Sequence, residues 1–341
     1  MRRVGLIGCG AVSRHYGEYF AKSNSSFQLD MVHDTDPVAG RQFAAKYQCR
    51  FEPSMEALLA ERLDLICILS PNTTHSPLAQ AALRAGHHVL VEHPLATTSD
   101  DGRAVLRAAA DCDRRIFVMR QRRYLKSVQI LNALVAAKQF GAVRKASMRL
   151  AWNRRPEYFQ ERPWRAESQN GGVVLNQASH FFDILIYLFG EPITVDGAVG
   201  NLLHKIDVED TAYGSIVFEH DVVVDFAVTT AAPEGHNSAE LLIIFDGRRV
   251  ALGGNHWEQL VGLTETEMAE ATGRLQGPLA GDHAGYLRRV EANLQDEPAE
   301  VVEGLDGLRV VCLIDSIYTK CRRENAAVSG LLDSTFRSLL S

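Results

Sequence analysis

Four polar side chains of a largely apolar stretch, residues 173–189, lie at intervals typical of one face of a helix. They are Asn176, His180, Asp183 and Tyr187, at positions i, i+4, i+7 and i+11. Such a line either satisfies buried hydrogen bonds, His180 to Asp183 among them, or forms a catalytic face. In the second case His180 is a general base that Asn176 or Asp183 orients over a substrate hydroxyl. The spacing alone leaves both interpretations open.

A glycine-rich turn between an expected strand and an expected helix is the second candidate site. Its first glycine would permit the tight turn, and its second would let the backbone approach a pyrophosphate at the helix N-terminus. Asp34 ends the next expected strand, where its carboxylate can accept hydrogen bonds from a ribose diol. Because Thr35 follows, and not a basic residue, NAD is preferred over NADP. The alternative is a tight turn with a helix-capping aspartate. The turn consists of Gly8, Cys9, Gly10, Ala11, Val12 and Ser13.

The elements that must position these residues fall into two groups. Up to about residue 120, short apolar runs alternate with amphipathic segments, as in a parallel sheet with helices on both faces. Beyond it, the helix at 173–189 is followed by runs with two-residue alternation, and Asp246-Gly247 is a hairpin signal. We expect an α/β Rossmann domain at 1–122. An α+β domain with an open, mainly antiparallel sheet, for substrate binding and oligomerisation, is expected at 123–341.

Composition indicates an ordinary soluble globular protein. The chain has 341 residues, of which 46% are hydrophobic and 23% charged, and its formal net charge is −6. An acidic balance and the lack of a run of about 18 apolar residues make nucleic acid and a membrane unexpected partners. The six cysteines form no Cys-x-x-Cys pair and have no zinc-site spacing, which favours reduced thiols in the cytoplasm and no metal site.

Five stretches together resemble the Gfo/Idh/MocA family, named after glucose-fructose oxidoreductase, inositol dehydrogenase and a rhizopine catabolism protein. They occur in family order, at residues 8–13, 70–75, 88–95, 171–183 and 307–311. The resemblance implies an NAD(P)-dependent oxidoreductase that transfers hydride between nicotinamide and a secondary hydroxyl or ketone of a sugar. It places Ser70, Asn72 and His75 near the nicotinamide half of the cofactor and Glu92 beside its ribose. His180 then moves the proton.

The segment Leu175 to His180 is similar to the branch of sugar-nucleotide 3-dehydrogenases, where Asn176 stands at an aspartate position of the inositol dehydrogenases. In that branch guanidinium groups would suit a phosphate or carboxylate, and tryptophan a sugar face. For the arginines, a solvated surface is the alternative. An exposed sheet face would support a homodimer or homotetramer. The candidate substrate residues are Arg122, Arg123, Arg154, Arg155, Trp164, Arg165 and Asp183.

One position departs from the family. Where the resemblance gives Glu-Lys-Pro, this chain has Glu92-His93-Pro94, with a cis bond expected before the proline. The family lysine lies beside the substrate hydroxyl, and a histidine of ordinary pKa, about 6.5, is mostly neutral at pH 7. His93 could still hydrogen-bond the reacting oxygen in a pH-sensitive enzyme. Alternatively, His93 and His180 form an acid/base pair for a retuned reaction, or the chain is a silent cofactor-binding sensor or regulatory protein.

Overall fold

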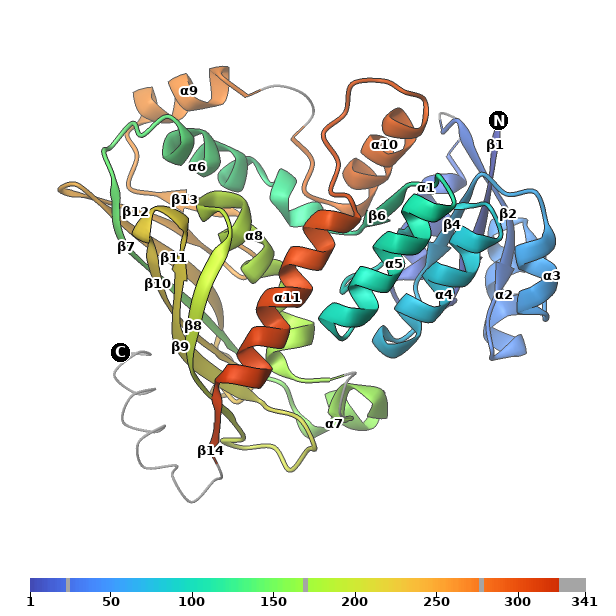
Figure 1. Cartoon of the computed structure of the whole chain (residues 1–341), viewed down its shortest axis with the longest axis horizontal. Helices are drawn as coiled ribbons and strands as arrows, with labels where there is room; N and C mark the ends of the chain where they lie inside the picture. Colours follow the sequence, from blue (N-terminus) through green and yellow to red (C-terminus); the bar gives the residue numbers. More distant parts are fainter. Residues whose placement is uncertain (23–24, 168–170, 276–278, 325–341) are drawn as a thin grey trace. The chain divides into compact units, whose positions relative to one another are not determined.

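The computed structural model describes residues 1–22, 25–167, 171–275 and 279–324, which divide into two compact units (Figure 1). The first unit comprises Met1–Gln121 together with Asp282–Val311. The second comprises the described residues of Arg122–Gly281 and of the chain from Cys312 to Glu324. Residues 282–311 thus group with the first unit, although most of the second sheet precedes them in sequence. No helix in the described ranges is long and apolar enough to cross a membrane.

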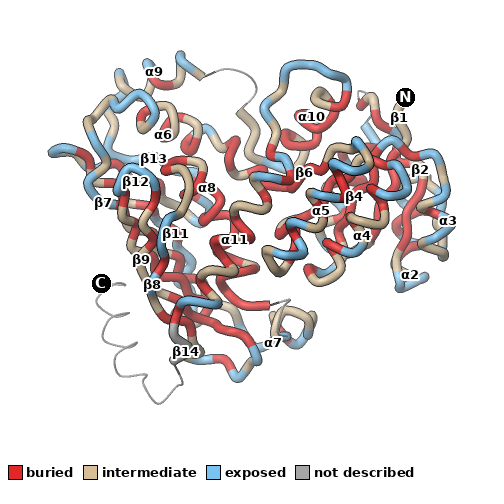
Figure 2. The backbone as a smooth tube through the Cα atoms, viewed as in Figure 1, coloured by how far each residue is buried: buried red, intermediate tan, exposed pale blue. Residues whose placement is uncertain are grey.

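The first unit is built on a parallel sheet of six strands in the order β3-β2-β1-β4-β5-β6. Because the order reverses between β1 and β4, right-handed crossovers place α1 and α2 on one face and α4 and α5 on the other. Both faces being covered, the central strands are continuously apolar and buried (Figure 2). The predicted Rossmann fold is confirmed. The strands are β1 (Arg2–Ile7), β2 (Phe27–His33), β3 (Arg50–Phe51), β4 (Leu65–Ile68), β5 (His88–Val91) and β6 (Ile116–Val118).

Helix ends in this unit follow local side-chain signals. α2 begins after Asp36, whose carboxylate accepts the N–H of Val38 at 2.8 Å. Thr98 caps α5 by accepting the N–H of Asp101 at 3.2 Å, and its hydroxyl donates to the Asp101 carboxylate at 2.8 Å. The helices are α1 (Ser13–Phe20), α2 (Pro37–Tyr47), α3 (Met55–Ala60), α4 (Asn72–Arg84), α5 (Ser99–Asp111) and α10 (His283–Leu294).

The second unit contains an open sheet of eight strands in the order β13-β12-β11-β7-β10-β9-β8-β14. Within the described ranges, only the β7/β10 and β8/β14 pairs are parallel, so the mainly antiparallel prediction is confirmed. The predicted hairpin joins β11 and β12 at Gly247, where φ is +79°. The strands are β7 (Val143–Trp152), β8 (Pro192–Gly200), β9 (Thr211–Phe218), β10 (Val223–Thr229), β11 (Asn237–Phe245), β12 (Arg248–Gly253), β13 (Gln259–Val261) and β14 (Arg322–Glu324).

The apolar helix of the second unit differs from its sequence prediction. Residues Val173–Ala178 wind as a π-helix, η3, and only Ser179–Phe189 form the α-helix α8. Glu209 anchors the first turn, because its backbone oxygen accepts the N–H of Val173 at 3.1 Å and its side chain accepts that of Val174 at 3.0 Å. A π-helix has more residues per turn, so Asn176 loses the regular α spacing to His180. The other helices of this unit are α6 (Lys126–Ala136), α7 (Pro156–Gln160) and α9 (Glu265–Gly273), and α11 (Gly304–Lys320) belongs to both units because the boundary falls after Val311.

Candidate cofactor and active site

The glycine-rich turn of the first unit is tight at its first glycine and open at its second. Gly8 has φ +99°, and a Cβ there would lie 2.8 Å from the backbone carbon of Leu69. A Cβ on Gly10 would meet no atom within 4 Å. Among the described residues, the backbone N–H groups of Gly10, Ala11 and Val12 have no acceptor. Donors without intramolecular acceptors at the start of a helix suit a pyrophosphate.

Asp34 lies beside this turn, directly after β2. One carboxylate oxygen accepts the N–H of Cys9 at 2.6 Å, and the other accepts the N–H of Asp36 at 2.7 Å. Each oxygen retains a lone pair for a ribose hydroxyl. Burial, reinforced by the charge of Asp34, raises the pKa of the Cys9 thiol to about 12. The thiol therefore stays protonated and is no nucleophile in this turn.

Glu92 follows β5 and is held by two residues that the sequence analysis did not single out. The hydroxyl of Tyr16 donates to Oε1 at 2.8 Å, and Nε2 of His283 lies 3.4 Å from the same oxygen. The ring of His15 stacks on His283 with centroids 4.5 Å apart. Burial would raise the pKa of Glu92, but the hydrogen bond and charge of His283, the charge of His93 and the Tyr16 hydroxyl lower it to about 2. Glu92 is thus a buried carboxylate next to His93.

His75 ties two loops of the first unit together. It is buried, with Nδ1 at 2.7 Å from the carbonyl oxygen of Pro94 and Nε2 at 2.8 Å from that of Ser70. The bond between His93 and Pro94 is cis, as expected. Burial lowers the pKa of His75, against which the two carbonyls and the charge of Glu92 act. The ring therefore faces backbone oxygens, and its place in the structure is that of a support for the Glu-His-Pro turn.

The predicted cofactor residues gather at one edge of the parallel sheet. The glycine-rich turn follows β1, Asp34 follows β2, Ser70 and Asn72 follow β4, and Glu92 follows β5. In a sheet of this order, dinucleotides bind outside the carboxyl ends of the strands, where the strand order reverses. β1 and β4 flank that reversal. The first unit thus brings these residues to the place that a dinucleotide requires.

Asp183, in the second unit, has an arginine as its partner. Its two carboxylate oxygens accept hydrogen bonds from Nε and Nη2 of Arg123, both at 2.8 Å, and both side chains are buried. The guanidinium also lies over the ring of Tyr187, 5.2 Å from its centroid, and Gln129 donates to the Tyr187 hydroxyl at 3.1 Å. Buried hydrogen bonds thus account for Asp183 and Tyr187, the two polar residues of this helix face that lie nearest its C-terminus. The partner, however, is Arg123 and not His180.

Guanidinium groups and aromatic rings alternate in a continuous band in the second unit, which we call the arginine–aromatic band. Arg154 lies over the rings of Trp152 (4.8 Å) and Tyr158 (5.2 Å), and Arg165 lies over Tyr158 (3.9 Å) and Trp164 (5.6 Å). Trp152 packs edge-on against Phe181 at 5.9 Å, over which Arg122 lies at 5.2 Å. The band consists of Arg122, Phe181, Trp152, Arg154, Tyr158, Arg165 and Trp164.

This band adjoins the helix of the candidate base. Phe181 follows His180, which is buried in the first turn of α8. Burial lowers the pKa of Arg122 to about 10, so its guanidinium remains charged at neutral pH. The other two candidate arginines differ. Arg123 is buried against Asp183, and Arg155 is exposed in an ion pair with Glu234.

The comparisons with known proteins agree with this architecture. Residues 2–120 match the oxidoreductase family with an NAD-binding Rossmann fold, and residues 128–249 match the GFO/IDH/MocA C-terminal domain. The chain belongs to the GFO/IDH/MocA family. The expected resemblance is confirmed, and the chain is an NAD-dependent oxidoreductase of the kind that acts on sugars.

Several relatives of this GFO/IDH/MocA protein act on sugars or cyclitols. UDP-N-acetylglucosamine 3-dehydrogenase of Acidithiobacillus ferrooxidans is 28% identical over 68% of this chain and 68% of its own length. Inositol 2-dehydrogenase of Rhizobium meliloti is 24% identical over 63% of each. The WlbA dehydrogenase of Bordetella pertussis, solved with NADH and UDP-GlcNAcA, is 25% identical with a TM-score of 0.85, covering 94% of this chain and 96% of that one. Nothing in these comparisons favours the sensor alternative.

Proposed function

We propose that this protein transfers hydride between NAD and a secondary hydroxyl or ketone of a nucleotide-linked pyranose, with C3 as the reacting carbon. The arginine–aromatic band carries the proposal, because it joins three guanidinium groups to aromatic rings beside the helix of His180. Guanidiniums pair with phosphate or carboxylate oxygens, and aromatic faces pack on sugar rings. The two relatives whose names or ligands include a UDP-sugar support the same substrate class.

The residues of the first unit hold and orient the cofactor in this proposal. The backbone N–H groups of Gly10, Ala11 and Val12 bind the pyrophosphate, and the free lone pairs of Asp34 accept the ribose hydroxyls. Ser70 and Asn72 lie toward the nicotinamide half, with Glu92 at the ribose. NAD supplies the hydride acceptor when it is bound. His75 acts through the turn that it supports.

Two imidazoles handle the proton and the developing charge. His180 accepts the hydroxyl proton at a ring nitrogen, with Asn176 as its orienting neighbour. His93 donates a hydrogen bond to the same oxygen, whose negative charge grows as hydride leaves the carbon. In the reverse reduction, His180 returns the proton to the oxygen and His93 keeps its hydrogen bond to that oxygen. We assign Asp183 to positioning, because Arg123 occupies both of its oxygens.

The nucleotide part of the substrate has a candidate hollow beside the band. A hollow of about 580 Å³ in the second unit is lined by Arg154, Arg155, Phe159, His204 and Lys205, among others. Its cationic and aromatic lining suits a diphosphate and a base. A cytoplasmic location and assembly into a homodimer or homotetramer are part of the same proposal.

The test compares UDP-linked pyranoses with the same free sugars, with turnover followed by NADH absorbance. We expect kcat/KM to be at least about 100-fold higher for the linked sugars, the effect of a few charge-assisted hydrogen bonds. Arg154→Gln should reduce that preference about tenfold, mainly through KM. The control is Arg144→Gln, which removes an exposed arginine of β7 that is paired with Asp246.

Three outcomes would contradict the proposal. Equal kcat/KM for linked and free sugars would mean that the protein does not recognise the nucleotide part of the substrate. A preference that Arg154→Gln leaves unchanged would mean that the arginine–aromatic band does not recognise the nucleotide. Tight NADH binding without turnover of any sugar, at both pH 6 and pH 9, would restore the sensor alternative.

A further inference from the structure

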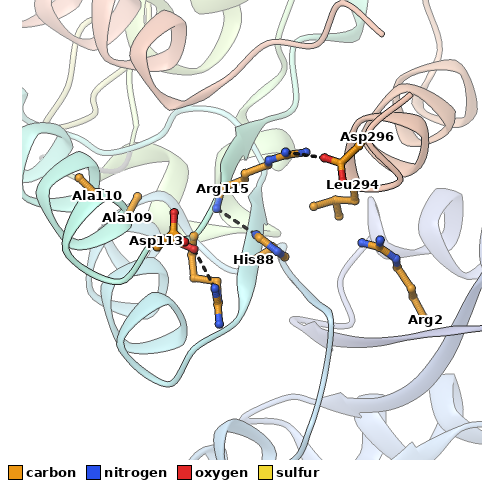
Figure 3. Close-up of a pocket in the computed structure, with 9 residues that line it drawn as sticks. Arg2, His88, Ala109, Ala110, Asp113, Arg115, Leu294 and Asp296 are labelled. Carbon is orange, nitrogen blue, oxygen red and sulfur yellow. Dashed lines mark hydrogen bonds and ion pairs between the residues drawn. The ribbon is translucent and has the colours of Figure 1, made fainter. Parts of the chain in front are cut away.

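A second polar hollow lies in the first unit, at the sheet edge opposite the glycine-rich turn (Figure 3). It measures about 450 Å³. Arg2 begins β1 and His88 begins β5, so the hollow lies at the amino ends of strands whose carboxyl ends carry the cofactor residues. It is therefore separate from the cofactor site. Its lining residues are Arg2, His88, Ala109, Ala110, Asp113, Arg114, Arg115, Leu294 and Asp296.

His88 presents a fixed donor to this hollow. The backbone N–H of Arg115 donates to Nδ1 of His88 at 3.0 Å, so a neutral ring carries its proton on Nε2. That Nε2–H has no acceptor within the described ranges. Figure 3 shows the ring lying between Arg115 and Arg2. A ligand that accepts a hydrogen bond would satisfy it.

Arg2 supplies a second donor group. Among the described residues, its guanidinium makes no hydrogen bond or ion pair, whereas the two other arginines of the hollow are engaged. Arg115 pairs with Asp296 at 2.8 Å and donates to the side chain of Asn293 at 3.0 Å. Arg114 donates to the carbonyl oxygen of Gly86 at 2.6 Å. Arg2 is thus the arginine of this hollow whose donors are available to a ligand.

The charges around the hollow favour an anion. Three arginines face two carboxylates, those of Asp113 and Asp296, and Asp296 is already paired with Arg115. Burial, followed by the charges of Arg114, Arg115 and Arg2, lowers the pKa of His88 to about 4, while Asp64 acts in the opposite direction. Above about pH 5 the imidazole of His88 is therefore neutral. A positive local potential opposes its protonation and attracts a negative ligand.

We propose that this hollow binds a small oxyanion, a phosphate group either free or as a monoester, between the Arg2 guanidinium and Nε2–H of His88. A charge-assisted hydrogen bond from Arg2 and a neutral one from His88 would hold the oxygens. The volume leaves room for an organic part beyond the phosphate itself. Because the bound group would join β1 and β5, it should also stabilise the first unit against unfolding.

Calorimetric titration of the NAD-saturated protein tests the site, since bound NAD occupies the glycine-rich turn. We expect inorganic phosphate to bind with a millimolar dissociation constant at fixed ionic strength, and Arg2→Gln to weaken it about tenfold or more. Glycerol 3-phosphate, compared with phosphate, shows whether a monoester is preferred. Arg84→Gln is the matched control, because that exposed arginine on α4 bonds only to Gln80 among the described residues. Arg154→Gln excludes binding at the arginine–aromatic band.

The imidazole signal of His88, assigned with His88→Gln, gives an independent measurement. Sulfate, which remains a dianion in acid, should raise the pKa of His88 from about 4 by about one to two pH units, since a nearby negative charge favours the imidazolium. Arg2→Gln should abolish this sulfate effect. Three results would overturn the proposal: no saturable binding of phosphate, binding that Arg2→Gln leaves unchanged, or a His88 pKa that is indifferent to sulfate.

Discussion

At position 93 a histidine stands next to a buried carboxylate of unusually low pKa. Glu92 stays ionised at every pH at which the protein is expected to work, because His283, His93 and Tyr16 outweigh the effect of its burial. A cation at position 93 is therefore tolerated electrostatically. The difference between lysine and histidine here lies in reach and in the pH range over which the charge persists.

His93→Lys should raise kcat about tenfold and flatten its pH dependence. A lysine ammonium keeps its charge up to about pH 10, so the developing oxyanion would be stabilised over the whole neutral range. The pH profile of kcat/KM for a UDP-linked sugar measures this. His236→Lys is the control, because it adds a charge at an exposed histidine of the second unit. Complete loss of turnover would mean instead that His93 performs its own proton transfer.

His283→Phe tests what keeps Glu92 ionised. The variant removes the hydrogen bond and charge of His283 but leaves the carboxylate buried, so the pKa of Glu92 should rise by about one to three pH units. Protonation of Glu92 on the acid side would then withdraw the negative charge beside His93. We expect a further loss of kcat/KM between about pH 5 and pH 3, in addition to the acid-side decline that protonation of His180 causes in the wild type.

His15→Phe serves as the control for this variant. It keeps a ring stacked on His283 and leaves the contact of His283 with Glu92 in place. Its acid limb should therefore match that of the wild type. If His283→Phe also has the wild-type limb, His283 does not hold the charge of Glu92.

The sequence predicted those residues of this site that a local sequence pattern or a family motif marks. Gly8 and Asp34 each follow an apolar strand, and a strand end is a local signal, whereas Glu92 is assigned through the family resemblance. Tyr16 and His283 lie far along the chain from Glu92, and only the folded unit brings them together. A buried tyrosine in an amphipathic helix carries no mark of the carboxylate that it will bond. Such partners cannot be predicted from spacing.

At the scale of elements, the pair between Arg123 and Asp183 joins the segment before α6 to α8. Both side chains are buried, with 7% and 2% of their area exposed, and the contact is bidentate. Removal of one partner leaves the other charge buried and unpaired, which is costly, whereas removal of both is not. The pair therefore fixes how these two elements meet.

Asp183→Asn should lower the free energy of unfolding by about 3 kcal/mol, measured by urea denaturation. The double variant Arg123→Met with Asp183→Leu should regain most of that loss. Lys145→Met, which breaks the exposed pair with Asp225, should cost less than about 1 kcal/mol. A substrate role for Asp183 would appear differently, as a raised KM with unchanged stability.

Periodicity predicted α8 but not the π-helix that precedes it. The apolar spacing over residues 179–189 is regular, and Phe182 packs on Phe226 of β10 with ring centroids 5.6 Å apart. Residues 173–178 depart from it because Glu209, on the approach to β9, captures the first two amides of the turn. The line of four polar residues is therefore split. Asp183 and Tyr187 contact Arg123, and Asn176 and His180 remain for the proposed chemistry.

At the scale of the molecule, the chain passes between its two units three times, after Gln121, after Gly281 and after Val311. Strand alternation predicted a change of architecture near residue 122, and the opening segment of the first unit ends at Gln121. It could not reveal that residues 282–311 return to the first unit, because an amphipathic helix such as α10 looks the same whichever sheet it covers. His283 reaches Glu92 only through this return. His93 and His180 are the two imidazoles of the proposed mechanism.

A double-mutant cycle tests whether these two histidines act on one substrate. If both serve the same oxygen, loss of either removes most of the advantage of the other, so their effects on kcat/KM should not add. We expect His93→Gln and His180→Gln each to reduce kcat/KM by at least about 100-fold, in the range of general acid–base catalysis. The double variant should lose less than about tenfold more than the worse single variant. Losses that multiply in full would mean that the imidazoles act in separate steps, and the shared-oxygen mechanism would fail.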